Sequence, residues 1–314
     1  MIILMKMGFT KQMSVDIFQF MVGCVFLYYG AEFLVKGSKK LALKFKIPSI
    51  MIGITVVALG TSLPELVVSI LANIKQKQGM VIGNVMGSNI TNIGLVLGLT
   101  ALISEVKFSF LKIRYDMYFF LIISFLPIAF IMMGGLFFWQ GIFFLFTLMV
   151  YLIFLINFER IDGVDKETSF INDKTLFLQI VIGTIGLSFG ATYFVEGAKG
   201  IAIFLGVSDL EIGMSIVALG TSLPELAASI ASIKHGENEF VIGNVIGSNI
   251  MNIVFVLGLA IMFGNVNVTF NEVYIQSFFL ISLSLIIFIM LKLRNGINQF
   301  SGLLLMISYL IFIY

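Results

Sequence analysis

Two glutamates stand in identical surroundings 160 residues apart. The decapeptide VALGTSLPEL at 57–66 returns letter for letter at 217–226, and each copy carries one glutamate, Glu65 or Glu225, inside a long apolar run. An ionisable side chain within a membrane span is costly to bury and is by default a functional residue. Two neighbouring carboxylates cannot both stay charged unless a cation or a proton accompanies them. The repeated glutamates therefore indicate a site for cations.

Each copy of the decapeptide also supplies neutral oxygen atoms. Proline lacks an N–H and its ring clashes with the carbonyl four residues back, so Pro64 and Pro224 predict a break in each helix. Carbonyl groups freed at membrane depth must face protein, water or an ion. Together with carboxylates and hydroxyls they are the hard ligands that Ca²⁺ and Na⁺ prefer. The residues expected on the same helical face as the glutamates are Ala58, Thr61 and Ser62 in the first copy and Ala218, Thr221 and Ser222 in the second.

A second repeated motif follows each decapeptide. Between 83–98 and 243–258 twelve of sixteen positions are identical, and the shared residues include Gly, Asn and Ser. Residues four apart share a helical face, and on this basis we expect four further ligands, Ser88, Asn92, Ser248 and Asn252. Two interpretations stay open for Asn84, Asn89, Asn244 and Asn249, which could bind ions or hold helices together by hydrogen bonds.

The composition identifies the kind of protein that carries these motifs. Of 314 residues, 59% are hydrophobic and 11% are charged, with a mean hydropathy of +1.08. Soluble domains are about 45–50% apolar and about 25% charged. Many apolar runs reach the roughly 20 residues that cross a bilayer as a helix, and they lack the alternation of barrel strands. The sequence predicts an all-α integral membrane protein, with the lipid bilayer as a partner.

The chain divides into two similar halves. Ten apolar segments are predicted, at about 14–35, 49–73, 80–103, 115–133, 136–157, 176–195, 208–233, 240–263, 274–291 and 297–314. We therefore expect a first five-helix repeat at 1–158, a cytoplasmic loop at 159–175 and a second five-helix repeat at 176–314. Because five is odd, the second copy enters the membrane from the opposite side, as in the inverted repeats of many transporters.

The basic residues predict the orientation in the membrane. Fourteen lysines and arginines fall in one set of loops and five in the other. Cytoplasmic loops carry the excess of positive charge. We therefore expect a multi-pass protein of the cell membrane with both termini extracellular. The sequence does not indicate an oligomeric state.

These residues and motifs closely resemble the cation/Ca²⁺ exchanger superfamily, nearest its prokaryotic sodium/calcium exchanger branch. The resemblance rests on ALGTSLPE at 58–65 and GNVMGSNI at 83–90, with their copies at 218–225 and 243–250. It implies that Glu65 and Glu225 bind Ca²⁺ with the carbonyls of Thr61 and Thr221. It implies Na⁺ sites at Ala58, Ser62 and Ser88, with Ala218, Ser222 and Ser248 as the symmetric set. It also implies that the first and sixth helices slide across a four-helix core.

The leading hypothesis is an antiporter that exchanges Ca²⁺ for Na⁺ by alternating access. The same glutamates could serve a Ca²⁺/H⁺ antiporter, since protons need no extra ligands. Asn92 and Asn252 are both asparagine, whereas some archaeal members carry an aspartate at the second position. This difference bears on the exchange stoichiometry and, to a lesser degree, on the coupling ion. A channel would need a continuous polar pore, whereas the polar residues gather in one cluster. No nucleotide-binding loop of the form GxxxxGK[ST] and no catalytic pairing appears in the sequence. Neither an enzyme, a cofactor nor a nucleic-acid partner is expected; Ca²⁺ and Na⁺ (or H⁺) are the ligands.

Overall fold

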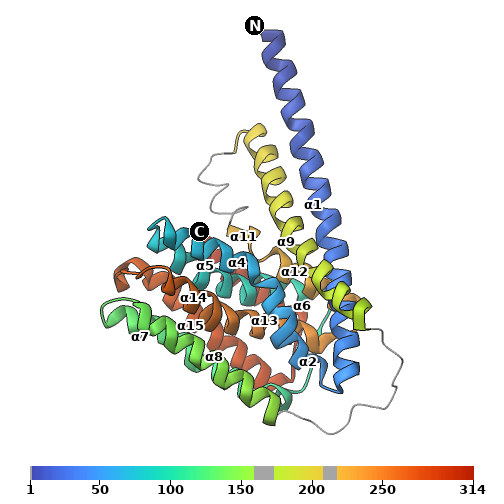
Figure 1. Cartoon of the computed structure of the whole chain (residues 1–314). Coiled ribbons are helices and arrows are strands. Elements are labelled where there is room, and N and C mark those ends of the chain that lie inside the picture. The colour runs from blue at the N-terminus through green and yellow to red at the C-terminus, as the bar shows by residue number, and fades with distance from the viewer. Residues whose placement is uncertain (1, 159–172, 208–217) are drawn as a thin grey trace.

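The computed structural model describes residues 2–158, 173–207 and 218–314, and most of them are helical (Figure 1). Within these ranges seven unbroken helices are long and apolar enough to cross a membrane. Five are α1 (Ile2–Phe45), α7 (Arg114–Met132), α8 (Phe138–Phe158), α9 (Asp173–Phe204) and α15 (Phe270–Arg294). The other two are composite: α5 (Gln78–Thr91), η2 (Asn92–Leu97) and α6 (Gly98–Ile103), and α13 (Asn238–Met251), η5 (Asn252–Leu257) and α14 (Gly258–Met262).

The other predicted spans are interrupted or short. The second comprises α2 (Ser49–Ile52), η1 (Gly53–Val57) and α3 (Ala58–Thr61), followed by α4 (Leu63–Ile74) after a bend of 44°. The seventh appears as α11 (Ala218–Gly220) and α12 (Leu223–Lys234), while its predicted beginning at 208–217 lies outside the described residues. The last is α16 (Gln299–Ile313), of 15 residues. The predicted all-α membrane fold is confirmed.

The links between helices include two features that the sequence did not predict. Strand β1 (Val106–Lys107) pairs in antiparallel fashion with β2 (Gly296–Ile297), beside a short 3₁₀ turn η3 (Phe110–Lys112). Helix α9 begins at Asp173, inside the predicted loop 159–175; the rest of that loop, 159–172, falls outside the described residues.

Helices α1 and α9 are much longer than the predicted segments 14–35 and 176–195. Hydropathy marks only the part of a helix that suits hydrocarbon, and both helices continue through charged residues at their ends. They form an antiparallel pair beside the rest of the molecule (Figure 1). A Cβ atom added at Gly30 would lie 2.7 Å from the backbone nitrogen of Leu187, and one at Gly190 would lie 2.6 Å from that of Leu27. The two backbones therefore touch through glycines, as closely packed membrane helices do.

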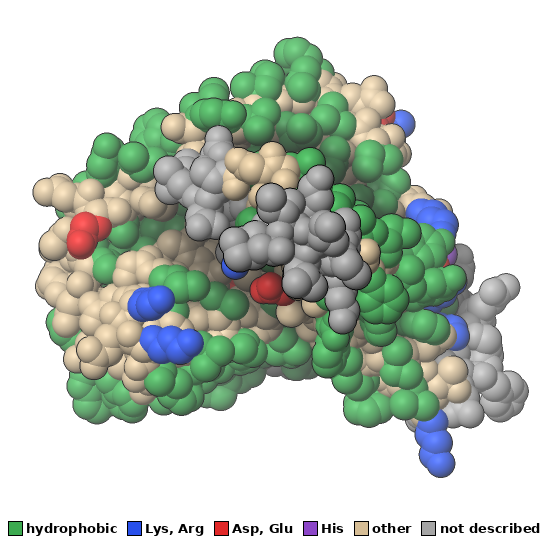
Figure 2. Space-filling model, turned by 90° about the horizontal axis from the view of Figure 1, so that it is seen from above, with side chains coloured by type: hydrophobic (Ala, Val, Ile, Leu, Met, Phe, Trp, Pro, Cys, Tyr) green, Lys and Arg blue, Asp and Glu red, His purple; other side chains and the backbone are tan. Residues whose placement is uncertain are grey.

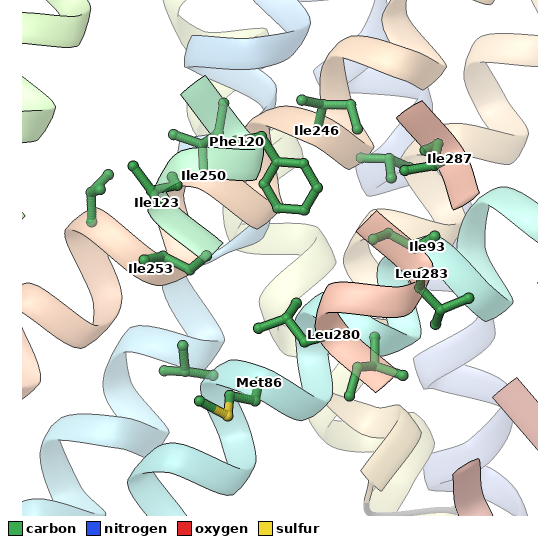
Figure 3. Packing of buried hydrophobic residues seen from close by; sticks show 14 of the residues in the cluster. Met86, Ile93, Phe120, Ile123, Ile246, Ile250, Ile253, Leu280, Leu283 and Ile287 are labelled. Carbon is green, nitrogen blue, oxygen red and sulfur yellow. The ribbon is translucent and has the colours of Figure 1, made fainter. Parts of the chain in front are cut away.

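Helices α5 and α13 lie at the centre of the remaining helices. Buried apolar side chains from α5, α7, α13 and α15 form one continuous cluster, in which Met86 and Phe120 lie among isoleucines and leucines (Figure 3). In the span that contains α13, 83% of the most apolar window is buried, against 22% for the span formed by α8. The outer surface is largely hydrophobic (Figure 2), as a surface facing lipid must be. The central helices are thus held rigidly, and they carry the second repeated motif.

Candidate cation site

The predicted helix breaks occur at corresponding places in both repeats. Ser62 leaves helical geometry with φ −84° and ψ 4°, and Ser222 does so with φ −89° and ψ 5°. A new helix starts one residue later, with Pro64 or Pro224 in its first turn, where the missing N–H is not needed. The break thus precedes each proline by two residues. The matching backbone angles show that the identical decapeptides adopt the same local structure.

Both glutamates lie in the first turn of the helix after the break. Glu65 is the third residue of α4 and Glu225 is the third residue of α12, and both side chains are fully buried. The amino-terminal end of a helix carries a partial positive charge that favours a carboxylate. The two carboxyl groups lie within electrostatic range of each other. Among the described residues, none of their four oxygens has a hydrogen-bond partner.

Hydroxyl groups from the two repeats meet at the breaks. The Thr61 hydroxyl lies 3.2 Å from Oγ of Ser248 and 3.3 Å from Oδ1 of Asn244. In the symmetric position, Oγ of Ser88 lies 3.4 Å from Oγ1 of Thr221. The hydroxyls of Thr61, Ser62 and Ser248 are also neighbours of the Glu225 carboxyl, without a well-aligned hydrogen bond to it. Each break therefore contacts the second motif of the opposite repeat.

Several other predicted ligands are buried without a protein partner. Oγ of Ser62, Oγ of Ser222 and Oδ1 of Asn92 lack a hydrogen bond in the described part of the chain, and so do both amide atoms of Asn252. Buried side-chain polar atoms are nearly always hydrogen-bonded, so such a concentration of exceptions is typical of a place that binds a polar ligand. The Asn92 amide nitrogen differs from that of Asn252, because it donates to Oδ1 of Asn249 at 3.1 Å.

The two alanines are placed differently by the structure. The carbonyl oxygen of Ala58 accepts the backbone N–H of Ser62 at 3.0 Å, and the Thr61 hydroxyl lies 3.3 Å from it. This oxygen lies at the break but already accepts these hydrogen bonds, so the break does not free it. Ala218 opens α11, and its surroundings lie outside what the structure describes.

Asparagine side chains donate hydrogen bonds to the backbone of the glutamates. The Asn84 amide donates to the carbonyl oxygen of Glu65 at 3.0 Å and to Ser69 Oγ at 2.9 Å. Asn244 donates in the same way to the carbonyl oxygen of Glu225 at 3.1 Å and to the Ser229 hydroxyl at 3.0 Å. Of the two interpretations left open for Asn84 and Asn244, these bonds support the structural one.

The sequence did not predict the two serines that accept hydrogen bonds from these asparagines. Ser69 and Ser229 are buried one turn after each glutamate and recur at the same offset of 160. That recurrence, at a spacing that shares a face with the glutamate, was a signal that could have found them. Asn89 has a further structural role, because its amide donates to the carbonyl oxygen of Asn249 at 3.2 Å.

The second motif changes helix type at the asparagines. The π-helical segments η2 and η5 begin at Asn92 and Asn252, and a third, η1, precedes the break in the second span. π-Helical turns are rare and occur frequently at functional sites. Here they disturb the regular backbone bonding close to the unpartnered amide groups.

The donor set suits a hard cation. The described residues contain no group of three or more His, Cys, Asp or Glu side chains that could hold a metal ion. The carboxyl pair with hydroxyl and amide oxygens instead matches the oxygen ligands of Ca²⁺ and Na⁺. Paired breaks in two repeats, meeting at a buried polar centre, define an ion carrier of the inverted-repeat class.

Comparison with known proteins agrees with this class. The model of the "Sodium/calcium exchanger protein" family matches residues 15–157 and 175–314. The chain is 36% identical to an uncharacterized membrane protein of Methanocaldococcus jannaschii over 93% of its own length and 95% of that protein. It is 32% identical to the sodium/calcium exchanger MaX1 of Methanosarcina acetivorans, over 96% and 98% of the two chains.

A solved structure shows the same fold. The sodium–calcium exchanger NCX_Mj, soaked with Na⁺ and Sr²⁺, superposes with a TM-score of 0.81 at 34% identity, covering 95% of this chain and 97% of that one. The protein belongs to the sodium/calcium exchanger family. It is therefore a membrane cation antiporter with the ten-span inverted-repeat fold, and not an enzyme.

Proposed function

We propose that the protein exchanges Ca²⁺ for Na⁺ and that both ions occupy the paired-glutamate site in turn. The observation that carries this proposal is the burial of four carboxyl oxygens of Glu65 and Glu225 without any hydrogen-bond partner in the described structure. Charged groups in such a setting need a cation or a proton. Two carboxylates balance one Ca²⁺ or two Na⁺, so the same pair suits either cargo.

Neutral oxygens complete the proposed coordination. Ca²⁺ takes six to eight oxygen ligands, more than two carboxylates can supply. Thr61 and Thr221 lie at the breaks, four residues before the glutamates in the chain, and their carbonyls are the proposed additional ligands. For Na⁺ and for any water that accompanies the ions, the proposed ligands are Ala58, Ser62, Ser88, Asn92, Ala218, Ser222, Ser248 and Asn252. The unpartnered oxygens of Ser62, Ser222, Asn92 and Asn252 support their place in this set.

Exchange follows from the charge of the site. An empty pair of buried carboxylates is unfavourable, so the carrier crosses between its two states when the pair is filled. Filling by Ca²⁺ from one side and by Na⁺ from the other couples the two fluxes. We further propose that the protein lies in the cell membrane with both termini outside and residues 159–175 inside, in keeping with the lysine distribution.

The relatives support sodium and calcium as the cargo. MaX1 is named as a sodium/calcium exchanger, and NCX_Mj was solved after soaking with Na⁺ and Sr²⁺. Protons remain the alternative counter-ion, because a carboxyl pair can take up H⁺ without further ligands.

Flux measurements separate the two coupling ions. Purified protein in proteoliposomes should accumulate ⁴⁵Ca²⁺ when a Na⁺ gradient is imposed at clamped pH and membrane potential. A pH gradient without Na⁺ should produce no uptake. Uptake driven only by the pH gradient would replace Na⁺ by H⁺ as the exchanged ion, and passive flux without any counter-ion would contradict exchange altogether. Glu105→Gln, a change at a half-exposed surface carboxylate, is the matched control.

A further inference from the structure

A group of ion pairs joins the α1/α9 helix pair to the rest of the molecule. Glu32 of α1 is buried, although it belongs to a long helix with many exposed side chains. One of its carboxylate oxygens, Oε1, accepts from Nζ of Lys234 at 2.8 Å, and the other, Oε2, lies 3.0 Å from Nε2 of His235. Both partners stand at the end of α12, more than 200 residues away in the chain. The His235 side chain is only 27% exposed.

Neighbouring side chains reinforce this contact. Lys36 approaches Oε2 of Glu32 at 2.9 Å, and the Tyr28 hydroxyl lies 2.6 Å from Nζ of Lys234. The Glu32 carboxylate and then the Tyr28 hydroxyl raise the pKa of Lys234, so its ammonium stays charged. One turn beyond Lys36, Lys39 pairs with Glu237 in the turn after α12 at 2.5 Å. Four charged side chains and His235 thus connect two helices that lie far apart in the chain.

The repeat shows that these charges occur on one face of the molecule only, the face where α1 meets the end of α12. Shifting each position by 160 replaces Glu32 by Thr192 and Lys39 by Lys199, and replaces Glu237 by Lys77. The symmetric contact would therefore bring Lys199 towards Lys77, two like charges. The packing is asymmetric in the same sense. Helix α1 packs against α12, whereas among the described helices α9 makes no comparable packing against α4.

We propose that Glu32 and Lys39 are positioning residues, which hold the α1/α9 pair against α12 on this face and bias the carrier towards the state in which this face is closed. In an inverted-repeat carrier the second state arises when the two repeats exchange conformations. The ion pairs exist in the first state alone, and the second state gains lysine repulsion in their place. A contact made in one state only shifts the population of the two states.

Isolated surface ion pairs contribute little to stability, and this group differs from them in two ways. The Glu32 side chain is only 10% exposed and has three basic partners, so it is poorly screened by salt. In addition, the pairs need not stabilise the fold to matter. They need only be present in one of two states that differ by a small free energy.

Cross-linking tests the contact without any transport. In a background with Cys24→Ala, the cysteines of Lys39→Cys and Glu237→Cys should be joined rapidly in ion-free buffer by a bifunctional thiol reagent whose spacer matches the length of the two side chains that it replaces. Adding Glu32→Gln should slow this reaction roughly fivefold to tenfold, because the closed state loses its remaining ion pairs. Adding Lys107→Gln, which changes an exposed lysine elsewhere, should leave the rate unchanged. An unchanged rate with Glu32→Gln would overturn the proposal.

Transport measurements then test the bias between the two states, and this test rests on the proposed function. Glu32→Gln should weaken the apparent Ca²⁺ affinity on one side of the membrane and strengthen it on the other, because it alters the ratio of states rather than the site. The paired exchange Lys39→Glu with Glu237→Lys should restore the wild-type ratio, which each single change disturbs. Affinities that fall together on both sides would show structural damage and refute the bias. If the wild type exchanged no Ca²⁺, the proposed function would fail, while the cross-linking rates would still decide on the ion pairs.

Discussion

Replacing one glutamate of the pair by glutamine separates charge from shape. Glu65→Gln keeps the size of a side chain that is fully buried and removes one negative charge of the site. Glutamine also keeps an oxygen that can bind a cation. The expected result is loss of Ca²⁺ exchange with the fold retained, and Glu225→Gln should behave alike because its surroundings repeat those of Glu65.

The magnitude follows from the charges that remain. With one carboxylate left, a bound Ca²⁺ keeps a net positive charge, for which the described residues around the pair offer only neutral hydroxyl and amide oxygens. Two unit charges at 4 Å interact with about 4 kcal/mol at an effective dielectric constant of about 20, and because Ca²⁺ carries two charges this figure is a lower bound. Each 1.4 kcal/mol is a factor of about ten in affinity. We therefore expect Ca²⁺ binding to weaken roughly a thousandfold.

The same substitution should stabilise the ion-free protein. Two buried carboxyls in electrostatic contact oppose folding unless they take up a proton or a cation, and glutamine removes that conflict. Thermal unfolding in detergent measures both effects. Wild-type protein should unfold at a higher temperature as Ca²⁺ is added. At a Ca²⁺ concentration a hundred times the dissociation constant, the free energy of unfolding should rise by about 2.7 kcal/mol. The Glu65→Gln protein should have a higher unfolding temperature than the wild type in the absence of ions, and this temperature should change little when Ca²⁺ is added.

A matched control keeps this result specific. Glu105→Gln removes a carboxylate whose side chain is 48% exposed and should leave both exchange and the Ca²⁺ response unchanged. Glu65→Gln protein that exchanges Ca²⁺ at a near-normal rate would refute the assignment of the pair as the site. A mutant that loses exchange but keeps the full Ca²⁺ response would place the binding site elsewhere.

Two further predictions concern the asparagine behind Glu225 and the packing of α1 against α9. Asn244→Ala removes the hydrogen bonds to the Glu225 carbonyl and to Ser229, so the Ca²⁺ affinity measured by isothermal titration should fall about tenfold without loss of exchange. The control is Asn298→Ala, which removes the N-cap of α16. It should lower the unfolding temperature and leave the Ca²⁺ affinity unchanged. Gly30→Leu should force α1 from α9 and cost about 1–3 kcal/mol or more, measured by thermal unfolding. A stable Gly30→Leu protein would contradict the close glycine contact.

The sequence predicted the parts of the fold that follow from local chemistry. Hydropathy located the spans, and the prolines located both helix breaks to within two residues. The identity of the two motifs placed the same side chains at both breaks. The contact between Thr61 and Ser248 was not predicted, and it shows that a break in one repeat meets the second motif of the other.

Other features depend on contacts that no local pattern reports. The ends of α1 and α9 extend beyond the apolar segments because charged residues are good helix formers too. The π-helical turns at Asn92 and Asn252 have no established sequence signal. The role of Glu32 is not visible in the sequence, because its partners Lys234 and His235 are remote in the chain and its repeat counterpart is a threonine. Distant pairing of this kind becomes visible only in three dimensions.

The two repeats agree where ions are proposed to bind and differ where the helix pair meets the rest of the molecule. Every proposed ligand has an identical residue in the other copy, so a bound ion meets the same ligand types from both repeats. A perfectly symmetric carrier would also populate its two states equally, whatever ion it bound. Glu32 and Glu237 have no acidic counterparts at Thr192 and Lys77, and this difference breaks the equality outside the site. The direction that the carrier favours at rest can therefore change in evolution through surface charges while the chemistry of the site stays constant.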